Sequence, residues 1–158
     1  MLIRFPWHPC PLRQDSSTLN QSKYIIDLLA RVSMLGSKPY ATSCTLGKNL
    51  TKSDGDALPN PIAYRHIVGP LQHSTLTKPN IAYIVNKLCQ FLHCPTLDHL
   101  QVAKRVLHYL KGTPNHGLHF APGPLQLYAY YDFYWASDPL DQRSTTGYFV
   151  FFRANLVS

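Results

Sequence analysis

The sequence predicts an α+β fold in which a small helical bundle is followed by an antiparallel β-hairpin. Two patterns predict it. Between residues 62 and 111, apolar residues recur at the three- and four-residue spacing of amphipathic helices. After Gly123-Pro124 the pattern changes to the alternation of a strand with one buried face. We therefore expect a helical region over residues 62–120 and a separate β region over residues 121–158.

The first 61 residues predict one helix between two irregular segments. Residues 1–18 contain three prolines and are expected to be irregular. Within residues 19–61, an apolar stripe predicts a helix over 22–34, and Gly36 supplies its stop. The rest is a long polar connector rich in proline and glycine. Such a length is unusual inside a compact domain. We expect the connector to lie as a strap over the surface of a larger body.

Three helices are expected next. The first covers residues 62–74 and contains Pro70, which removes a backbone donor and crowds the preceding turn at a cost of roughly 3 kcal/mol. This helix should therefore be either bent or broken near Gly69-Pro70. The second covers residues 80–93, and Asn80 is suited to cap its start.

The third helix is bounded by clearer signals. It covers residues 96–111, with Thr96 as its N-terminal cap and Gly112 as its stop. One face is apolar and the other carries cations. Helices of this length do not hide their apolar stripes alone, so the three should pack as a small bundle.

The β region predicts a single hairpin. Residues 125–132 alternate and form the first strand, residues 138–141 form a turn, and residues 146–152 form the second strand. No further strand or covering helix is expected. A lone hairpin is only marginally stable in water. Its apolar face must pack on the helices or stay exposed, and an exposed face would favour self-association.

The composition favours a polyanionic partner. The formal net charge is +7 and the isoelectric point is about 9.3. All eight acidic residues are aspartates, so the chain contains no glutamate. No run of 18 apolar residues occurs, which predicts no membrane span. Residues 62–120 carry six lysines and arginines against Asp98 alone, a net charge of +5.

Several motifs in a fixed order resemble a known family. They are residues 21–29, Ser37-Lys38-Pro39, residues 64–83, residues 85–91, His99 and residues 104–113, followed by residues 130–136 and 141–148. Together they resemble the C-terminal reverse-transcriptase region and the start of ribonuclease H in copia-type LTR retrotransposon Pol polyproteins. The resemblance covers residues 19–158, and residues 1–18 match nothing. It implies that the hairpin is the incomplete start of a ribonuclease H-like sheet.

The resemblance also implies a metal-binding role for Asp132. In the family this residue is the first carboxylate of a nuclease that cleaves RNA in RNA–DNA hybrids with two divalent ions, normally Mg²⁺. Tyr134 stands where the family has a second aspartate, and the remaining carboxylates are expected beyond Ser158. The polymerase centre needs aspartates at a palm turn, and this chain has no Asp-Asp pair. We therefore expect Asp132 to be vestigial and the isolated chain to be inactive, with no cofactor.

The cations of the helical region are the remaining functional feature. The expected nucleic-acid-binding residues are Lys104, Arg105, Lys111, Arg65 and Lys87. The resemblance implies that this region corresponds to the thumb and connection, which hold the primer–template by its phosphates. Phosphate contacts need cations on one face and carry no sequence information. The alternative is a solvated polar face on an amphipathic helix.

Two further groups of side chains can each be interpreted as functional or as structural. Tyr128, Tyr130, Tyr131 and Trp135 are suited to stacking on bases, but such residues more often pack within strands. Cys89, His93, Cys94 and His99 cluster in the sequence, but their spacing fits no common zinc module, which favours a structural role.

The sequence leaves the compartment open. It shows no secretory signal, so reduced thiols in an intracellular setting are the default expectation. The start carries Arg4 and Arg13 with no acid before Asp15, as a mitochondrial presequence would, but its prolines interrupt the required helix.

Three functions compete at this point. The first is an inactive Pol fragment with residual, non-specific affinity for RNA or DNA. The second is a domesticated nucleic-acid-binding module, and the third is an interaction module whose hairpin pairs with a partner's sheet.

Overall fold

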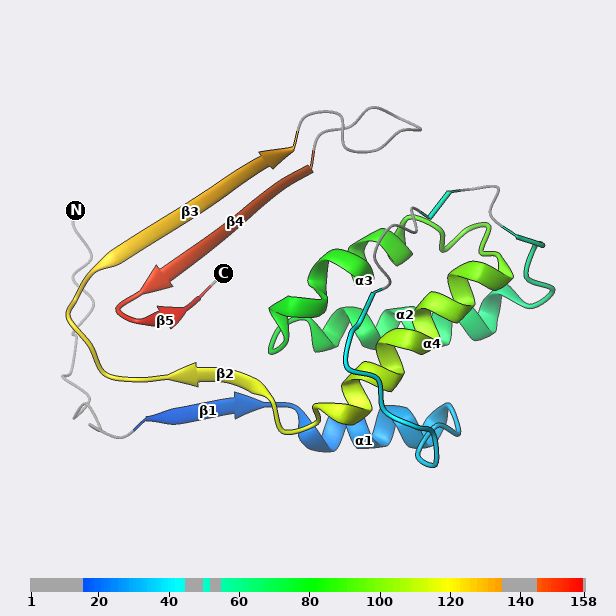
Figure 1. Cartoon of the computed structure of the whole chain (residues 1–158), viewed down its shortest axis with the longest axis horizontal. Coiled ribbons are helices and arrows are strands. Elements are labelled where there is room, and N and C mark those ends of the chain that lie inside the picture. The colour runs from blue at the N-terminus through cyan, green and yellow to red at the C-terminus, as the bar shows by residue number, and fades with distance from the viewer. Residues whose placement is uncertain (1–15, 45–49, 52–54, 135–144, 158) are drawn as a thin grey trace, which may run out of the picture.

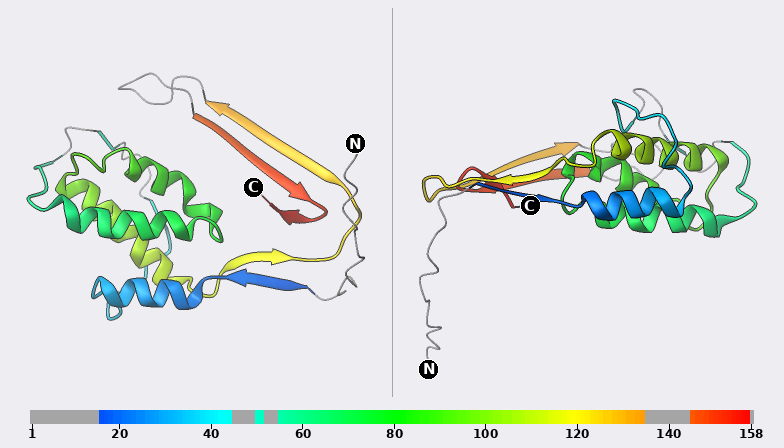
Figure 2. Two further views of the ribbon diagram at one scale, coloured as in Figure 1. Left: turned by 180° about the vertical axis from the view of Figure 1, so that it is seen from behind. Right: turned by 90° about the horizontal axis from the view of Figure 1, so that it is seen from below.

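The computed structural model describes residues 16–44, 50–51, 55–134 and 145–157. It consists of a helical body and two small antiparallel sheets that extend to one side of it (Figures 1 and 2). The α+β class predicted from the sequence is confirmed. No helix among the described residues is both long and apolar enough to cross a membrane.

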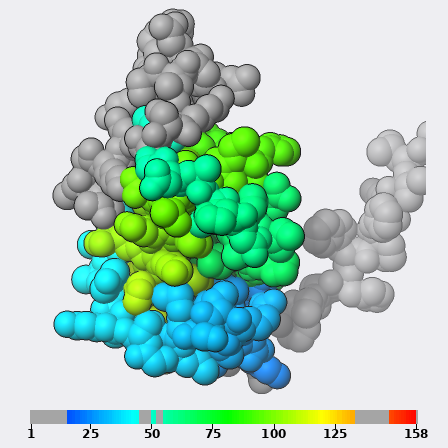
Figure 3. All heavy atoms as spheres, turned by 90° about the vertical axis from the view of Figure 1, so that its right-hand side faces the viewer, coloured from blue at the N-terminus to red at the C-terminus, as the bar shows by residue number. Residues whose placement is uncertain are grey.

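Four α-helices and one 3₁₀ helix form the body. They are α1 Ser22–Arg31, α2 Pro61–Ser74, η1 Pro79–Ile81, α3 Ala82–Cys89 and α4 Leu97–Gly112. Their apolar faces meet in one core, whose largest fully buried side chains include Tyr64, Leu71, Leu88 and Leu107. Figure 3 shows α1 packed along one edge of the other helices. The expected helical bundle is thus present, and α1 belongs to it.

Helix α2 continues unbroken through Pro70, although the proline has no backbone N–H to donate to the preceding turn. Asn60 caps the start, its Oδ1 accepting from Ile62 N at 3.0 Å. The Pro70 carbonyl accepts from Ser74 Oγ at 3.2 Å and from Tyr24 Oη at 3.3 Å. These contacts come from both α2 and α1, and they tie the proline turn to the body.

Two expected helix boundaries were wrong. The first helix ends at Arg31 and not at residue 34, because Ser33 adopts a left-handed backbone with φ 56°. The segment 80–93 divides into η1 and the shorter α3. Asn80 does not cap α3; it lies inside η1 and its side-chain amide donates to Tyr109 Oη on α4. A tertiary contact has replaced the local one.

Helix α4 begins as predicted. Thr96 Oγ1 accepts from His99 N at 3.4 Å, while Thr96 N donates to His99 Nδ1 at 3.1 Å. This reciprocal pair is a capping box in which a histidine takes the place of the usual glutamate or glutamine. The helix runs through Gly112, one residue beyond its predicted end.

The sequence did not predict the smaller sheet. Strand β1, Ser17–Asn20, pairs antiparallel with β2, Gly117–Phe120. Ser17 and Thr18 are therefore not irregular, as residues 1–18 were expected to be. A Cβ added at Gly117 would lie 2.1 Å from the Leu19 carbonyl oxygen, so only glycine fits this pairing.

The second sheet has three strands in the order β3-β4-β5. Strand β3, Leu127–Tyr134, pairs with β4, Thr145–Phe152, in a register that places Asp132 opposite Gly147. The predicted hairpin is present, but the expectation of no further strand was wrong. Strand β5, Asn155–Leu156, follows a two-residue turn and extends the sheet. The identity of this sheet with the ribonuclease H sheet stays a prediction.

Candidate nucleic-acid interface

The C-terminal half of α4 is covered by the connector. Lys111 Nζ donates to the Ser37 carbonyl, and His108 Nδ1 donates to the Lys38 carbonyl at 2.7 Å. Tyr40 N donates in return to the His108 carbonyl at 3.2 Å. The connector is therefore a strap, as predicted, but the body beneath it is this chain's own α4.

Arg105 and Tyr40 hold the next turn of the strap. Arg105 Nη2 donates to Thr42 Oγ1 at 2.8 Å, and the guanidinium carbon lies 5.2 Å from the centroid of the Tyr40 ring. The same ring stacks on His108 with a centroid distance of 4.4 Å. Arg105 and Lys111 thus have structural partners and are only half-exposed.

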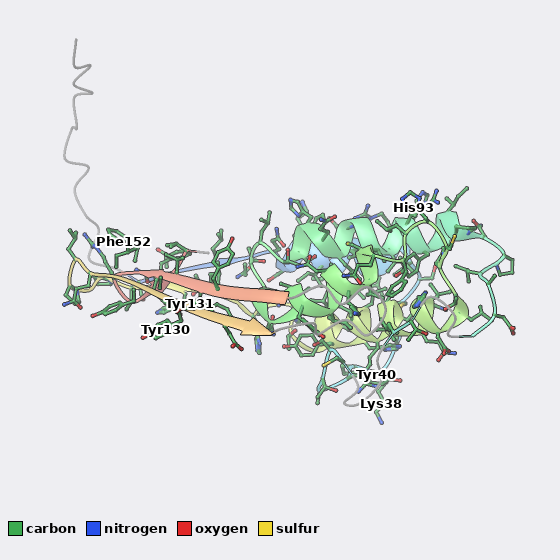
Figure 4. All side chains as sticks on the ribbon, turned by 90° about the horizontal axis from the view of Figure 1, so that it is seen from above. Lys38, Tyr40, His93, Tyr130, Tyr131 and Phe152 are labelled. Atoms are coloured by element: carbon green, nitrogen blue, oxygen red, sulfur yellow. The ribbon has the colours of Figure 1, made fainter. Side chains whose placement is uncertain are left out.

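Two lysines on the surface formed by the connector and α4 are well placed to contact phosphates. Lys104, on α4 beside Arg105, and Lys38, on the strap, are both exposed. No hydrogen bond or ion pair joins either side chain to another described residue. Figure 4 shows Lys38 and Tyr40 projecting from the same side of the helical body. We call the set Lys38, Tyr40, Lys104, Arg105, His108 and Lys111 the strap face. Asp98, the acid of α4, lies in the first turn, at the other end of the helix.

The remaining predicted cations lie on other helices. Arg65, on α2, donates from Nε to the Leu92 carbonyl at 2.9 Å, and Lys87 is half-buried on α3. Lys78 has a different role: its side chain is 3% exposed and its Nζ donates to the Thr113 carbonyl at the end of α4. Burial lowers the pKa of Lys78. Arg65 and Lys78 thus join separate parts of the helical body, and neither of these hydrogen bonds involves the strap face.

Sequence reasoning missed Lys38 and Tyr40 as members of this surface. Both stand in the connector, whose polar composition carries no periodicity that would place it on a helix. The only signal was Ser37-Lys38-Pro39, which entered the analysis as a motif of resemblance and not as a charge on α4.

Asp132 is exposed on β3, and its opposite residue in the sheet offers no side chain. Within the described ranges, no group of three or more histidine, cysteine, aspartate or glutamate side chains is placed to hold a metal ion. Trp135 and the turn residues 138–141 lie outside the described residues.

The clustered cysteines and histidines have separate roles. His99 is fully buried, stacks on Phe91 at 4.0 Å and completes the α4 capping box. Because its Nδ1 accepts a backbone N–H, its Nε2 carries the proton and donates to the Thr51 carbonyl at 3.0 Å. Burial raises the pKa of the Cys89 thiol, whereas Cys94 and His93 are exposed.

Comparison with known proteins decides the family. The chain is 48% identical over 134 residues, 84% of its length, to the retrovirus-related Pol polyproteins from transposons RE1 and RE2 of Arabidopsis thaliana. This chain belongs to the copia-type retrotransposon Pol family. The expectation drawn from the motif order is confirmed. The chain spans only 9% of the length of these Pol polyproteins.

The chain is also similar to a shorter protein. The chain is 42% identical over 157 residues to an uncharacterised mitochondrial protein of Arabidopsis thaliana, covering 99% of this chain and 63% of that protein. No protein-family model matches the sequence. No solved structure matches it either.

Proposed function

We propose that this chain is a segment of a retrotransposon Pol polyprotein that holds nucleic acid by its phosphates and performs no catalysis by itself. The strap face carries this proposal. It combines four lysine and arginine side chains from the connector and from α4, and the Arg105 guanidinium lies over the exposed ring of Tyr40. Phosphate binding requires cations on one surface and a scaffold that keeps them together.

The strap contributes that scaffold. Arg105 and Lys111 fix the connector on α4, and the Lys38 carbonyl bonds to His108, one helical turn after Lys104. Because the two exposed lysines make no described ion pair, a phosphate would not have to displace a carboxylate from them. Arg105 and Lys111 lie on the same surface and add to the local positive potential.

Binding is tested best with the exposed pair, because Arg105 and Lys111 also support the fold. The double variant Lys38→Ala/Lys104→Ala is compared with the parent on duplex DNA at several salt concentrations. Each phosphate contact contributes about 0.9 to the slope of log affinity against log salt, so the slope should fall by about 2. The matched control is Lys23→Ala, an exposed lysine on α1.

The same titration tests sequence dependence. Scrambled duplexes should bind with equal affinity because no base readout is involved. An unchanged slope in the double variant, or an equal fall in Lys23→Ala, would show that the strap face is only a solvated surface.

The small number of carboxylates that match a nuclease centre supports the catalytic inactivity of the isolated chain. A nuclease that uses two metal ions needs several carboxylates to hold them, and Asp132 is the one described residue that matches the family's nuclease centre. We expect no cleavage of a labelled RNA–DNA hybrid with Mg²⁺ or Mn²⁺ and no primer extension on a poly(A) template. Hybrid cleavage that disappears in Asp132→Asn would overturn this part of the proposal.

A second candidate function is favoured by the free edge of β3. This strand pairs on one side with β4 and ends the three-stranded sheet, so its other edge has no partner among the described strands. Tyr131 on β3 is 85% exposed. Such an edge is a template for strand addition from another chain. If the chain self-associates here, its apparent mass should rise with concentration, and Tyr131→Lys should abolish the rise because edge charges oppose pairing.

A further inference from the structure

One face of the three-stranded sheet carries a ladder of aromatic rings. Tyr128 pairs with Phe151 and Tyr130 with Phe149, and residues opposite one another in a sheet lie on the same face. The Tyr130 and Phe151 rings meet edge to face, with centroids 6.1 Å apart at 83°. Figure 4 shows Tyr130 and Phe152 on opposite sides of the sheet, as this alternation requires.

The aromatic ladder forms one wall of a pocket. A pocket of about 380 Å³ is lined by Tyr128, Tyr130 and Phe151 together with Gln126, Arg153 and residues of the adjoining turns. Tyr130 is 61% exposed, so its ring is available to a ligand. Among the residues that the structure describes, no carboxylate lines the pocket and Arg153 is its one charged group. A planar, uncharged surface thus lies next to a cation.

Arg153, which lines this pocket, has two uncommon properties together. Its backbone is left-handed, with φ 60°, in the turn between β4 and β5, a conformation that glycine or asparagine adopts more readily. Its Nε is buried and has no hydrogen-bond partner among the described residues. Residues held in such sparsely populated conformations tend to occur where a ligand is bound. The turn itself is held by Arg153 N, which donates to the Gln126 carbonyl at 2.7 Å.

We propose that this face binds single-stranded nucleic acid, with bases stacked on Tyr130 and its neighbouring rings and a phosphate held by Arg153. Every base offers a planar face to an aromatic ring, so the stacking is tolerant of sequence. Asp132 lies on the same face, two residues beyond Tyr130 and at the far end of the ladder from Arg153. The phosphate is therefore drawn to the Arg153 end.

Charge favours this occupant over a second copy of the chain or an apolar peptide. The chain carries a net charge of +7. The pocket's cation, Arg153, lies 5.8 Å from the centroid of the Phe152 ring and has no carboxylate among the described residues that line the pocket. This site differs from the strap face in its chemistry, because the strap face recognises phosphates alone whereas this one also stacks bases.

The test exploits the left-handed turn. Arg153→Gly removes the side chain while giving the turn the residue that accepts φ 60° without strain, so the fold is retained. Tyr130→Leu removes the stacking surface and keeps an apolar residue. The matched control is Tyr131→Leu, which changes a more exposed tyrosine on the other face.

The probes are a single-stranded oligo(dA) of about ten nucleotides, within known single-strand site sizes, and an abasic strand of the same length. The parent should prefer oligo(dA). Tyr130→Leu should lower the affinity for oligo(dA) by about fivefold or more and remove the preference over the abasic strand. Arg153→Gly should weaken both strands and lower the salt slope by about 0.7. Tyr131→Leu should bind as the parent does.

Three results would overturn the proposal. The first is equal affinity of the parent for oligo(dA) and the abasic strand, which would leave only phosphate binding. The second is an equal loss in Tyr131→Leu and Tyr130→Leu. The third is self-association abolished by Tyr130→Leu without any oligonucleotide binding, which would assign this face to a second copy of the chain.

Discussion

His99 Nε2 lies 3.0 Å from the carbonyl oxygen of Thr51. Through this contact a buried ring in the first turn of α4 holds a residue of the connector 48 positions earlier in the chain. The other ring nitrogen closes the capping box with Thr96. One side chain therefore fixes both the start of α4 and the path of the connector.

Replacing His99 with alanine should destabilise the protein by about 3 kcal/mol, because the cap, the contact with Phe91 and a buried ring are lost together. Urea denaturation measures the change. His93→Ala, an exposed histidine six residues earlier, should stay within about 0.5 kcal/mol of the parent. Similar losses in the two variants would contradict the role given to His99.

The Lys78→Met variant should alter how stability depends on pH. Burial lowers the pKa of Lys78 in the folded chain below its ordinary value of 10.5. Between the two pKa values the unfolded chain binds more protons, so the free energy of unfolding contributed by Lys78 rises with pH. The parent should therefore gain stability relative to Lys78→Met as pH rises from neutral towards 10.5.

Denaturation of both proteins at several pH values measures this difference. Tyr64 and Cys89, whose pKa values burial raises, oppose the trend in each protein and cancel in the comparison. A constant difference across the range would show that Lys78 is not held in its buried position.

Cys89 should react with iodoacetamide more slowly than Cys94. The thiolate is the reactive form, and burial raises the pKa of Cys89 while Cys94 is exposed only five residues away. Peptide mass spectrometry after timed alkylation resolves the two residues. Denaturant should make the two rates equal, and equal rates in its absence would contradict the burial of Cys89.

Gly117→Ala should separate β1 from β2 at a cost of about 1–3 kcal/mol, because the added Cβ would meet the Leu19 carbonyl. Gly147→Ala is the matched control, since no atom lies within 4 Å of the added group in β4. Hydrogen exchange should show faster exchange of the Leu19 and Leu118 amides in Gly117→Ala only. Unchanged protection there would show that β1 does not pair with β2.

Sequence patterns predicted the elements whose signals are local. Thr96 caps α4 as expected because its hydrogen bonds reach only three residues along the chain. Strands β3 and β4 were expected because alternation is a property of neighbouring residues. Asn80 has an equally good capping side chain, yet it bonds to Tyr109, since a partner from a distant helix satisfied its amide.

The candidate interface was predicted only in part, for the same reason. Lys104, His108 and Lys111 are visible in the sequence as one helical face. Their relation to Lys38 and Tyr40 depends on the connector returning across α4, which no periodicity encodes. Strand β1 was also missed, because four residues carry too little pattern and its partner β2 lies about a hundred residues away.

The sequence by itself determined the family, the α+β class and the excess of positive charge, because motif order, residue spacing and composition are properties of the chain alone. Only the tertiary structure decided which charges are free. Lys78 is buried and donates to a backbone carbonyl, and Lys111 donates to a carbonyl of the strap. Lys38 and Lys104 remain exposed. A lysine or arginine side chain is available to a phosphate only when it does not already donate to an acceptor within the fold. Which acceptors lie near it depends on how distant segments of the chain pack together.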